Sequence, residues 1–323
     1  MICKICNTEI ESEPLNVCEM MFGMRTVHAY FECPNCEALQ IAQIPGDLDR
    51  YYPDNYYSFK RQPDVDIRPT YLRKIKSSYL LYNRNKVVGS LLSIGYKVPE
   101  YTRWLKVAGV NYADAILDVG SGSGDVLSQY CRAGFTDLTG IDPFLQQEFK
   151  SSNGQLKLLR KSIFDEQVPR AFDFVMLNHS FEHMDSPILV FRRLAELVKP
   201  GKILLIRTPV NKSFASKKYG IHWVDLDAPR HLVVHSAKSL QLLASAHHFA
   251  IERIDFDSTA FQFWGSEQYL RDIPLYDPES LAMNKNSNLF SKMQVKEWTR
   301  QAEQLNKTGE GDQASFYLRR IAE

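Results

Sequence analysis

Residues 115–127, AILDVGSGSGDVL, are the segment most indicative of the fold. It opens with an apolar run that predicts a buried strand, and it ends in apolar residues that begin a helical pattern. Between them, Gly120, Gly122 and Gly124 permit positive φ angles and let a ligand approach the backbone closely. Asp125 is in position to cap the helix. A strand that turns through glycines into a helix is the geometry of a nucleotide-binding turn.

A second expected strand, residues 138–142, ends in Asp142, which lies 22 residues after Gly120. An acid about 20 residues beyond the first glycine is placed to bind ribose hydroxyls. No phosphate-binding lysine follows the glycines, so a P-loop is a poor interpretation. Asp125 occupies the place of the third glycine of a dinucleotide-binding motif, which disfavours a dehydrogenase. A glycine-rich turn that serves only as a tight connection is the simpler alternative.

Two sequence motifs, LDVGSGSG at residues 117–124 and GIDP at residues 140–143, resemble those of class I S-adenosylmethionine-dependent methyltransferases. The resemblance covers roughly residues 80–260. It implies an α/β, Rossmann-like fold with a seven-stranded sheet and S-adenosyl-L-methionine as the cofactor. It also implies that the glycine turn and its acid hold the methionine part, and that the acid of the next strand holds the ribose. The cofactor-binding residues expected on this basis are Asp118, Gly120, Ser121, Gly122, Gly124, Asp142, Pro143, Ser162, Ile163 and Asn178.

Strands alternate with helices after the glycine turn, as a parallel sheet requires. The seven expected strands cover residues 115–117, 138–142, 155–160, 172–177, 203–206, 250–256 and 314–319. The expected helices cover residues 71–93, 101–107, 188–197, 238–246 and 296–305. We expect a zinc-ribbon module at 1–45, a connecting loop and helical lid at 46–109, and the methyltransferase core at 110–323, with a substrate-cap insertion at about 261–312. The tyrosine-rich part of the loop, residues 51–59, is expected to pack beneath a domain rather than to form a lid over a substrate.

Four of the six cysteines form two Cys-x-x-Cys pairs, Cys3 with Cys6 and Cys33 with Cys36. Two such pairs separated by a couple of dozen residues can supply four thiolates to one tetrahedral zinc ion. Four thiolates close the coordination shell, so the sequence predicts a structural zinc and not a catalytic one. Two disulfides or reduced core thiols are the alternatives.

The segment NHSFEH, residues 178–183, follows the expected strand at 172–177. Ligands in open α/β sheets bind beyond the carboxyl ends of the strands, so chemistry is expected here. The segment resembles a turn of small-molecule methyltransferases that include ubiquinone-type O-methyltransferases. His179, Glu182 and His183 are therefore candidate catalytic residues, with His183 expected to orient the acceptor. In the alternative, Glu182 only forms a salt bridge and His179 only bonds to the backbone.

The loop after the fifth expected strand carries the pattern W-x-x-x-D-x-P-R-H. This pattern resembles a segment in bacterial methyltransferases of sugar and polysaccharide gene clusters. We expect His231 to be the base and Arg230 to hold an anionic part of the acceptor. In the alternative, Arg230 clamps Asp225 or Asp227 and His231 caps the helix at Ser236. The residues expected to contact the substrate are His222, Trp223 and Arg230.

Composition limits the partners. The chain has 323 residues, 44% of them apolar, and a formal net charge of +1. No run of 18 apolar residues occurs, so we expect no membrane partner, and the near-neutral charge gives no global reason to expect nucleic acid. The opening residues, MICK, lack the apolar core of a signal peptide, which favours a cytoplasmic location. Nothing in the sequence indicates the oligomeric state.

The expected reaction transfers a methyl group from S-adenosylmethionine to a small molecule, namely a hydroxyl of a sugar or of a nucleotide-linked sugar. A neutral hydroxyl is a poor nucleophile, so a base is required, and His183 and His231 are the leading candidates because histidine titrates near neutral pH. A sugar C-methyltransferase is one alternative, since known members likewise combine an N-terminal zinc module with this core. The other is a non-catalytic adaptor whose ribbon binds a partner such as nucleic acid and whose cofactor pocket is vestigial. The intact glycines, Asp118 and Asp142 disfavour the adaptor.

Overall fold

The computed structural model describes residues 1–53, 67–168 and 171–322. The tyrosine-rich stretch expected at 51–59 therefore lies outside the described residues from position 54 onward. Contacts divide the chain into two compact units. Unit 1 consists of Met1–Pro53, His179–Phe191 and Arg207–Phe316. Unit 2 consists of Asp54–Asn178, Arg192–Ile206 and Tyr317–Glu323.

The central sheet follows the alternation of strands and helices that the sequence predicts. Its strands are β4 (Ala115–Val119), β5 (Asp137–Ile141), β6 (Phe149–Lys150), β7 (Leu156–Leu159), β8 (Phe172–Asn178), β9 (Val198–Pro209), β11 (Phe249–Phe256) and β12 (Gln313–Arg320). They are ordered β11-β12-β9-β8-β4-β5-β7-β6, and β9 and β12 contribute residues to both units. The pairs β4–β5, β4–β8 and β5–β7 are parallel. The seven predicted strands and the Rossmann-like fold are thus confirmed, and β6 adds a two-residue antiparallel edge that is too short to show a sequence period.

Strand order reverses at β4, because the chain adds β5 and β7 on one side of it and β8 on the other. Such a switch point leaves a crevice at the carboxyl ends of the strands, where ligands bind in open α/β sheets. The glycine turn follows β4, and Asn178 ends the neighbouring strand β8. The topology of unit 2 therefore places the predicted cofactor residues at the edge where a ligand is expected.

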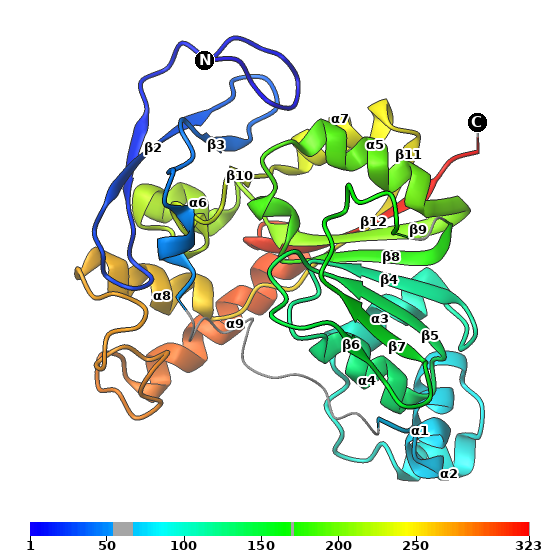
Figure 1. Cartoon of the computed structure of the whole chain (residues 1–323). Coiled ribbons are helices and arrows are strands. Elements are labelled where there is room, and N and C mark those ends of the chain that lie inside the picture. Colours follow the sequence, from blue (N-terminus) through cyan, green and yellow to red (C-terminus); the bar gives the residue numbers. More distant parts are fainter. Residues whose placement is uncertain (54–66, 169–170, 323) are drawn as a thin grey trace. The chain divides into compact units, whose positions relative to one another are not determined.

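Helices complete unit 2. They are α1 (Tyr71–Tyr82), α2 (Lys86–Leu91), α3 (Glu100–Ala108) and α4 (Asp125–Ala133), whereas α5 (Pro187–Leu197) has residues in both units. Trp104 of α3 and Tyr130 of α4 are buried with Ile116, Leu138 and Phe174 of the sheet, so these helices cover one of its faces (Figure 1). Apolar side chains on both partners supply the driving force for this packing.

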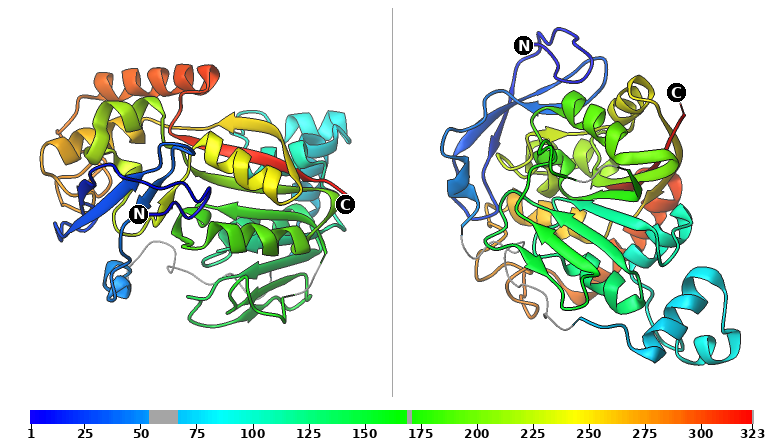
Figure 2. Two further views of the ribbon diagram at one scale, coloured as in Figure 1. Left: turned by 90° about the horizontal axis from the view of Figure 1, so that it is seen from above. Right: turned by 45° about the vertical axis from the view of Figure 1, so that its right-hand side comes forward.

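The prediction of one helix over residues 71–93 is wrong. Asn83 and Asn85 take positive φ angles of 56° and 52°, and they separate α1 from α2. Asparagine tolerates the left-handed conformation, and Asn83 ends α1 by donating its backbone N–H to the carbonyls of Ser78 and Tyr79. The right-hand view of Figure 2 shows the resulting helical pair, in cyan, projecting beyond the strands of unit 2.

Unit 1 contains a second sheet, which begins with the N-terminal strands β1 (Leu15–Cys18), β2 (Val27–Glu32) and β3 (Leu39–Ile41). The fourth strand is β10 (Val233–Val234), which pairs with β3 in an antiparallel manner (Figure 1). The remaining helices of this unit are α6 (Phe214–Tyr219), α7 (Ala237–Ala246), α8 (Phe261–Leu270) and α9 (Lys292–Thr308). Its short 3₁₀ turns are η1 (Leu48–Tyr51), η3 (Phe181–His183), η4 (Gly220–His222) and η5 (Val224–Leu226).

The N-terminal strands do not pack as a body of their own, because they share unit 1 with the segment that carries β10 and α6 to α9. The domain boundaries predicted near residues 45 and 109 remain predictions. Within the described ranges, none of the helices combines the length and apolarity that a membrane crossing requires.

Candidate functional site

The glycine turn in unit 2 has the conformation that its sequence predicts. Gly120, Gly122 and Gly124 have φ angles of 77°, 49° and 76°, which side chains rarely tolerate. The N–H groups of Gly120 and Ser121 donate to the carbonyl of Ile141, so the turn is tied to the end of β5. The chain therefore needs glycine here to pass from β4 into α4.

Asp118 and Ser121 carry buried oxygen atoms with unused hydrogen-bonding capacity. Within the described part of the chain, Asp118 Oδ1 and Ser121 Oγ have no hydrogen-bond partner. Burial, and next the charge of Asp142, raises the pKa of Asp118 to about 8. An unsatisfied buried polar group costs roughly 1–3 kcal/mol, so these atoms mark a place where a polar ligand can supply the missing partners.

Asp142 is joined to the glycine turn through its carboxylate. One oxygen accepts from the N–H of Gly122 at 2.9 Å and the other from the N–H of Phe144 at 2.8 Å. Each carboxylate oxygen can accept a further hydrogen bond, so the acid keeps capacity for ligand hydroxyls. The structure thus brings Gly122 and Asp142 into contact, and the role of Asp142 at a ribose remains a prediction.

The other predicted cofactor residues described below have no contact that points to a ligand. Pro143 is exposed beside Asp142. Ser162 Oγ accepts from the N–H of Phe164 at 3.3 Å, so its hydroxyl stabilises a local turn. The side chain of Ile163 is buried. Asn178 is half-buried at the end of β8. These residues line the same carboxyl edge of the sheet, and their contacts do not distinguish a binding role from a structural one.

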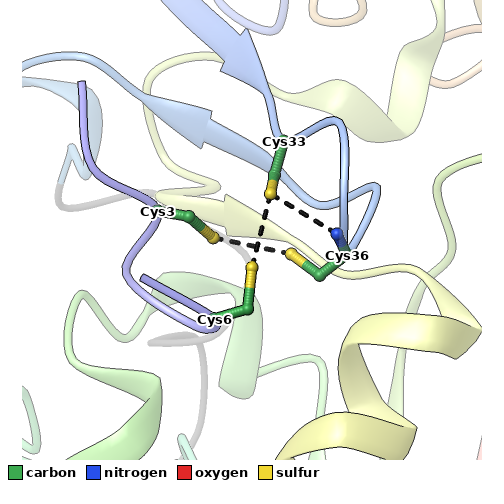
Figure 3. Close-up of side chains that lie close together, drawn as sticks. All are labelled: Cys3, Cys6, Cys33 and Cys36. Atoms are coloured by element: carbon green, nitrogen blue, oxygen red, sulfur yellow. Dashed lines mark hydrogen bonds between the residues drawn. The ribbon is translucent and has the colours of Figure 1, made fainter. Parts of the chain in front are cut away.

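The four N-terminal cysteines of unit 1 converge on one point (Figure 3). Sγ atoms of Cys3 and Cys36, and those of Cys6 and Cys33, lie 3.5 Å apart, and all four lie within 4.8 Å of one another. A tetrahedral zinc with bonds of about 2.3 Å places its sulfur ligands roughly 3.8 Å apart. All six cysteines belong to the described residues and none forms a disulfide, so the predicted disulfide alternative is not what the structure shows.

The two cysteine turns share one backbone design. Asn7 N–H donates to the carbonyl of Cys3, and Glu37 N–H donates to that of Cys33. Asn7 and Glu37 both take positive φ angles, of 56° and 62°. Backbone N–H groups point at the sulfurs, with Ile5 N 3.4 Å from Cys3 Sγ. Donors directed at sulfur stabilise thiolates, which are the form that binds metals.

A second cluster in unit 1 contains Glu182, His183 and His231, and one ligand atom of each lies within 4.8 Å of the others. Glu182 is fully buried, and its oxygens contact His179 Nδ1 at 3.3 Å and accept from Thr208 Oγ1 at 3.1 Å. Burial acts to raise the pKa of Glu182, but the hydrogen bond from His179 and the nearby histidines outweigh it and hold that pKa well below its usual range. The cluster therefore contains a buried carboxylate.

Two backbone carbonyls set the tautomers of the histidines in this cluster. His183 Nδ1 lies 2.9 Å from the carbonyl oxygen of Arg230, and His231 Nδ1 lies 2.8 Å from that of Asp225. A carbonyl only accepts, so each Nδ1 carries the hydrogen and the neutral ring keeps a lone pair on Nε2. Burial, and next the nearby His231, lowers the pKa of His183, which favours its neutral form.

The structure does not support a catalytic role for His179. Its Nδ1 contacts Glu182 Oε1, and its Nε2 contacts the guanidinium of Arg207. Because the guanidinium can only donate, Nε2 accepts and Nδ1 donates, and both nitrogens are used. His179 instead orients Glu182. The alternative in which it bonds only to the backbone is also incorrect.

Arg230 was expected to hold the substrate, and the structure corrects this expectation. Its side chain is completely buried, with Nη2 2.6 Å from Asp227 Oδ1 and 2.9 Å from Glu19 Oε1. The guanidinium therefore already forms ion pairs with two carboxylates. This agrees with the structural alternative, in which Arg230 binds Asp227. Releasing it to an anionic acceptor would leave buried charges unpaired, which is costly.

Trp223 is likewise structural, because its indole is buried and its Nε1 donates to Asp312 Oδ2 at 2.9 Å. His222 is half-buried at the end of η4. His231 does not cap α7, since Ser236 itself accepts from the N–H of Ser239 at that helix start.

Sequence reasoning missed three residues that hold the histidines and their loop. Tyr30 donates its hydroxyl to the carbonyl of His231 at 2.8 Å, and Tyr52 Oη lies 3.3 Å from His183 Nδ1. Glu19 is the third, through its pair with Arg230. These contacts join segments 131 to 211 residues apart. No local sequence signal reports such pairs.

A family model described as a methyltransferase domain matches residues 68–254, which is more than half of the chain. The chain therefore belongs to this family, and it is an S-adenosylmethionine-dependent methyltransferase, as the glycine turn predicts. No curated protein matches the sequence.

Solved structures similar to the chain share little sequence with it. A protein from Galdieria sulphuraria, described as a sarcosine dimethylglycine methyltransferase, is 13% identical with a TM-score of 0.47; the match covers 85% of this chain and 98% of that one. The cyclopropane synthase MmaA2 from Mycobacterium tuberculosis is 14% identical with a TM-score of 0.44, over 78% and 99% of the chains. The 1,6-didemethyltoxoflavin-N1-methyltransferase of Burkholderia thailandensis, solved with S-adenosylhomocysteine, is 12% identical with a TM-score of 0.43, over 96% and 100%. Similarities this low give no information on the methyl acceptor.

Proposed function

We propose that this methyltransferase transfers the methyl group of S-adenosylmethionine to a hydroxyl of a small sugar or sugar-like acceptor. The observation that carries the proposal is the pair of imidazoles beside Glu182, His183 half-buried and His231 buried, each with its lone pair on Nε2. The sugar class rests on the resemblance of the W-x-x-x-D-x-P-R-H segment to methyltransferases of sugar gene clusters. Because Arg230 is neutralised by two carboxylates, we propose that recognition at this loop does not depend on an anionic group of the acceptor.

We propose that the cofactor binds to residues of unit 2 at the carboxyl ends of β4 and β5. The unpartnered oxygens of Asp118 and Ser121 fit the polar methionine end, since an ammonium group can donate to both. Asp142 keeps hydrogen-bonding capacity for the ribose hydroxyls. When bound, S-adenosylmethionine supplies an electrophilic methyl group on a positively charged sulfur.

We propose that His231 is the base and that His183 orients the acceptor. His231 Nε2 lies 4.0 Å from Glu182 Oε1, so the imidazolium formed by proton uptake gains a nearby negative charge. This arrangement, with Nδ1 held by a carbonyl and Nε2 beside a carboxylate, keeps one nitrogen in position to accept the hydroxyl proton. The lowered pKa of His183 keeps its ring neutral and able to accept a hydrogen bond.

Kinetics of two variants test this assignment. General-base catalysis contributes about 10²–10⁴ in rate, so His231→Gln is expected to lower kcat at least about a hundredfold, and His183→Gln to raise KM for the acceptor more than it lowers kcat. Affinity for S-adenosylmethionine should stay within about twofold, and His248→Asn, at an exposed position outside the cluster, should behave as wild type. Wild-type turnover in both cluster variants would overturn the assignment.

The acceptor atom can be identified in the same assays. Methyl-labelled S-adenosylmethionine and a panel of free and nucleotide-linked sugars would give products whose methyl carbon is read by NMR. An oxygen-bound methyl group is expected. A carbon-bound methyl group would instead establish the sugar C-methyltransferase alternative.

We also propose that the four cysteines hold one structural zinc ion. Their sulfurs already lie close to the spacing of a tetrahedral thiolate site, and four thiolates leave no open position for catalysis. Metal analysis should find one zinc equivalent fewer in Cys33→Ser than in the wild type or in Cys18→Ser, which changes an exposed cysteine outside the cluster. Equal zinc in all three proteins, or none in the wild type, would contradict the proposal.

A further inference from the structure

We infer that Glu182, His183 and His231 form a second metal site, which binds a divalent transition-metal ion independently of the four cysteines. One potential ligand atom of each residue lies within 4.8 Å of those of the other two. All three residues belong to unit 1. The inference rests on this geometry and does not depend on the proposed acceptor or on methyl transfer.

The histidines are held as metal-ligating histidines usually are. A ligating imidazole typically donates its second N–H to a carbonyl or a carboxylate, which fixes the tautomer and the ring orientation. His183 meets this condition through the carbonyl of Arg230, and His231 through the carbonyl of Asp225. Tyr30 in turn donates to the carbonyl of His231, which steadies the backbone of this ligand. The lone pairs on both Nε2 atoms are therefore prepared without any metal present.

Charge around the cluster favours a cation. Glu182, Asp227 and Glu19 bring three carboxylates, and Arg230 brings one guanidinium that is shared between the last two. His231 Nε2 lies 4.0 Å from Glu182 Oε1 and 3.8 Å from Asp227 Oδ2, so both carboxylates face the proposed ligand nitrogen. A buried negative excess of this kind is stabilised by a bound cation.

The donor set selects the class of ion. Two imidazoles and one carboxylate suit zinc, cobalt, nickel or iron(II), whereas magnesium and calcium prefer sites made of oxygen atoms alone. A tetrahedral ion with bonds of about 2.1 Å places its ligand atoms roughly 3.4 Å apart. The 4.0 Å between His231 Nε2 and Glu182 Oε1 therefore has to close by about 0.6 Å.

Three protein ligands leave a coordination position open, unlike the closed four-thiolate site. A bound ion would also occupy the Nε2 lone pairs that the proposed base uses. Metal and proton thus compete for the same nitrogens.

Cobalt(II) binding to the full chain, with its cysteine site loaded with zinc beforehand, tests the inference. Wild type is expected to bind one further equivalent of cobalt, with X-ray absorption showing nitrogen and oxygen neighbours and no sulfur. The absence of thiolate-to-cobalt charge-transfer bands would show that cobalt has not entered the cysteine site. His231→Gln and His183→Gln should weaken this binding more than the roughly 10–100-fold typical of losing an outer-shell partner, whereas His248→Asn should leave it unchanged.

Two results would overturn the inference. One is the absence of a second equivalent in the wild type, a measurement that does not depend on whether any variant folds. The other is a second equivalent that survives in both His231→Gln and His183→Gln. Wild-type methyl transfer in His231→Gln together with loss of cobalt binding would count against the proposed base and leave the metal site standing.

Discussion

Asp118 shows how burial and a neighbouring carboxylate can prepare a residue for a charged ligand. Its Oδ1 lacks a partner among the described residues, and burial with the neighbouring Asp142 raises its pKa to about 8. At neutral pH most of the ligand-free protein therefore carries this carboxyl group in its protonated form. A cationic ligand beside it favours the charged form, so binding of such a ligand should expel the proton.

We therefore expect the affinity for S-adenosylmethionine to rise as the pH is raised toward about 8, by up to about tenfold per pH unit. Asp118→Asn should abolish this dependence, whereas Asp125→Asn, at an exposed acid of the same turn, should keep it. Calorimetry in buffers of different ionisation enthalpy should count close to one proton released in the wild type.

The raised pKa of Asp118 also predicts how the stability of the ligand-free protein depends on pH. The folded state keeps a proton on Asp118 that the unfolded chain loses above about pH 4, so stability from this group falls as the pH rises from about 4 to about 8. Asp118→Asn should flatten that slope. An unchanged pH dependence of both affinity and stability in Asp118→Asn would show that the carboxyl group is ionised without ligand.

At the scale of elements, Gly124 in the turn between β4 and α4 is required both for its positive φ angle and for the lack of space around it, whereas Gly109 is required for its φ angle alone. Gly124 has a φ of +76°, and a Cβ there would lie 2.7 Å from the side chain of Leu158, which is itself buried. Gly109 at the end of α3 has a φ of +67°, but a Cβ there would meet nothing within 4 Å. The two glycines share the backbone strain and differ in the space around them.

Alanine at each position should separate these two costs. Gly109→Ala is expected to lower the free energy of unfolding by about 1 kcal/mol through backbone strain alone. Gly124→Ala should lose about 1–3 kcal/mol more, because the added methyl group overpacks the core around Leu158. Urea unfolding measures both. Equal losses would mean that Leu158 moves aside without cost.

Gly124→Ala should also weaken S-adenosylmethionine binding, since it alters the proposed binding turn. Gly109→Ala should not. A weakened affinity in both variants would instead point to a general loss of stability in unit 2.

At the scale of the molecule, ion pairs tie the N-terminal strands of unit 1 to segments far along the chain. Arg230 pairs with Glu19 across 211 residues, and both side chains are completely buried. Arg25 pairs with Asp272 across 247 residues, and these side chains are 49% and 72% exposed. The two pairs close loops of similar length in opposite environments.

Removing the guanidinium should therefore lower the free energy of unfolding by very different amounts in the two pairs. Arg230→Met leaves Glu19 and Asp227 buried without a counter-charge, so we expect it to cost roughly 3–5 kcal/mol of stability. Arg25→Met should cost far less stability, because water screens the exposed pair. Denaturant unfolding compares them.

A double-mutant cycle with Glu19→Gln isolates the pair itself, since the coupling energy excludes the loss of packing by the arginine stem. Similarly small losses of stability in Arg230→Met and Arg25→Met would show that the carboxylates of Glu19 and Asp227 become solvated or protonated in Arg230→Met. The ion pairs of Arg230 with Glu19 and Asp227 would then not be what holds the loop of His231 in place.

Features that depend on residues close together in the chain could be predicted from the amino-acid sequence. Strands and helices show as apolar periodicity, the glycine turn follows from the φ angles that only glycine adopts easily, and the cysteine pairs follow from spacing within one turn. For that reason the seven strands and the methyltransferase class were predictable. The break at Asn83 was missed because the apolar pattern continues on both sides of it.

The partners of the polar groups in this loop are visible only in the folded chain. Arg230 and His231 are adjacent in sequence and equally suited to a site, yet the first is enclosed by Glu19 and Asp227 while the second keeps a lone pair on Nε2. Their roles depend on burial and on partners up to 211 residues away. Periodicity and spacing report the local chain, whereas the protonation and partners of a buried group are set by the groups that folding places around it.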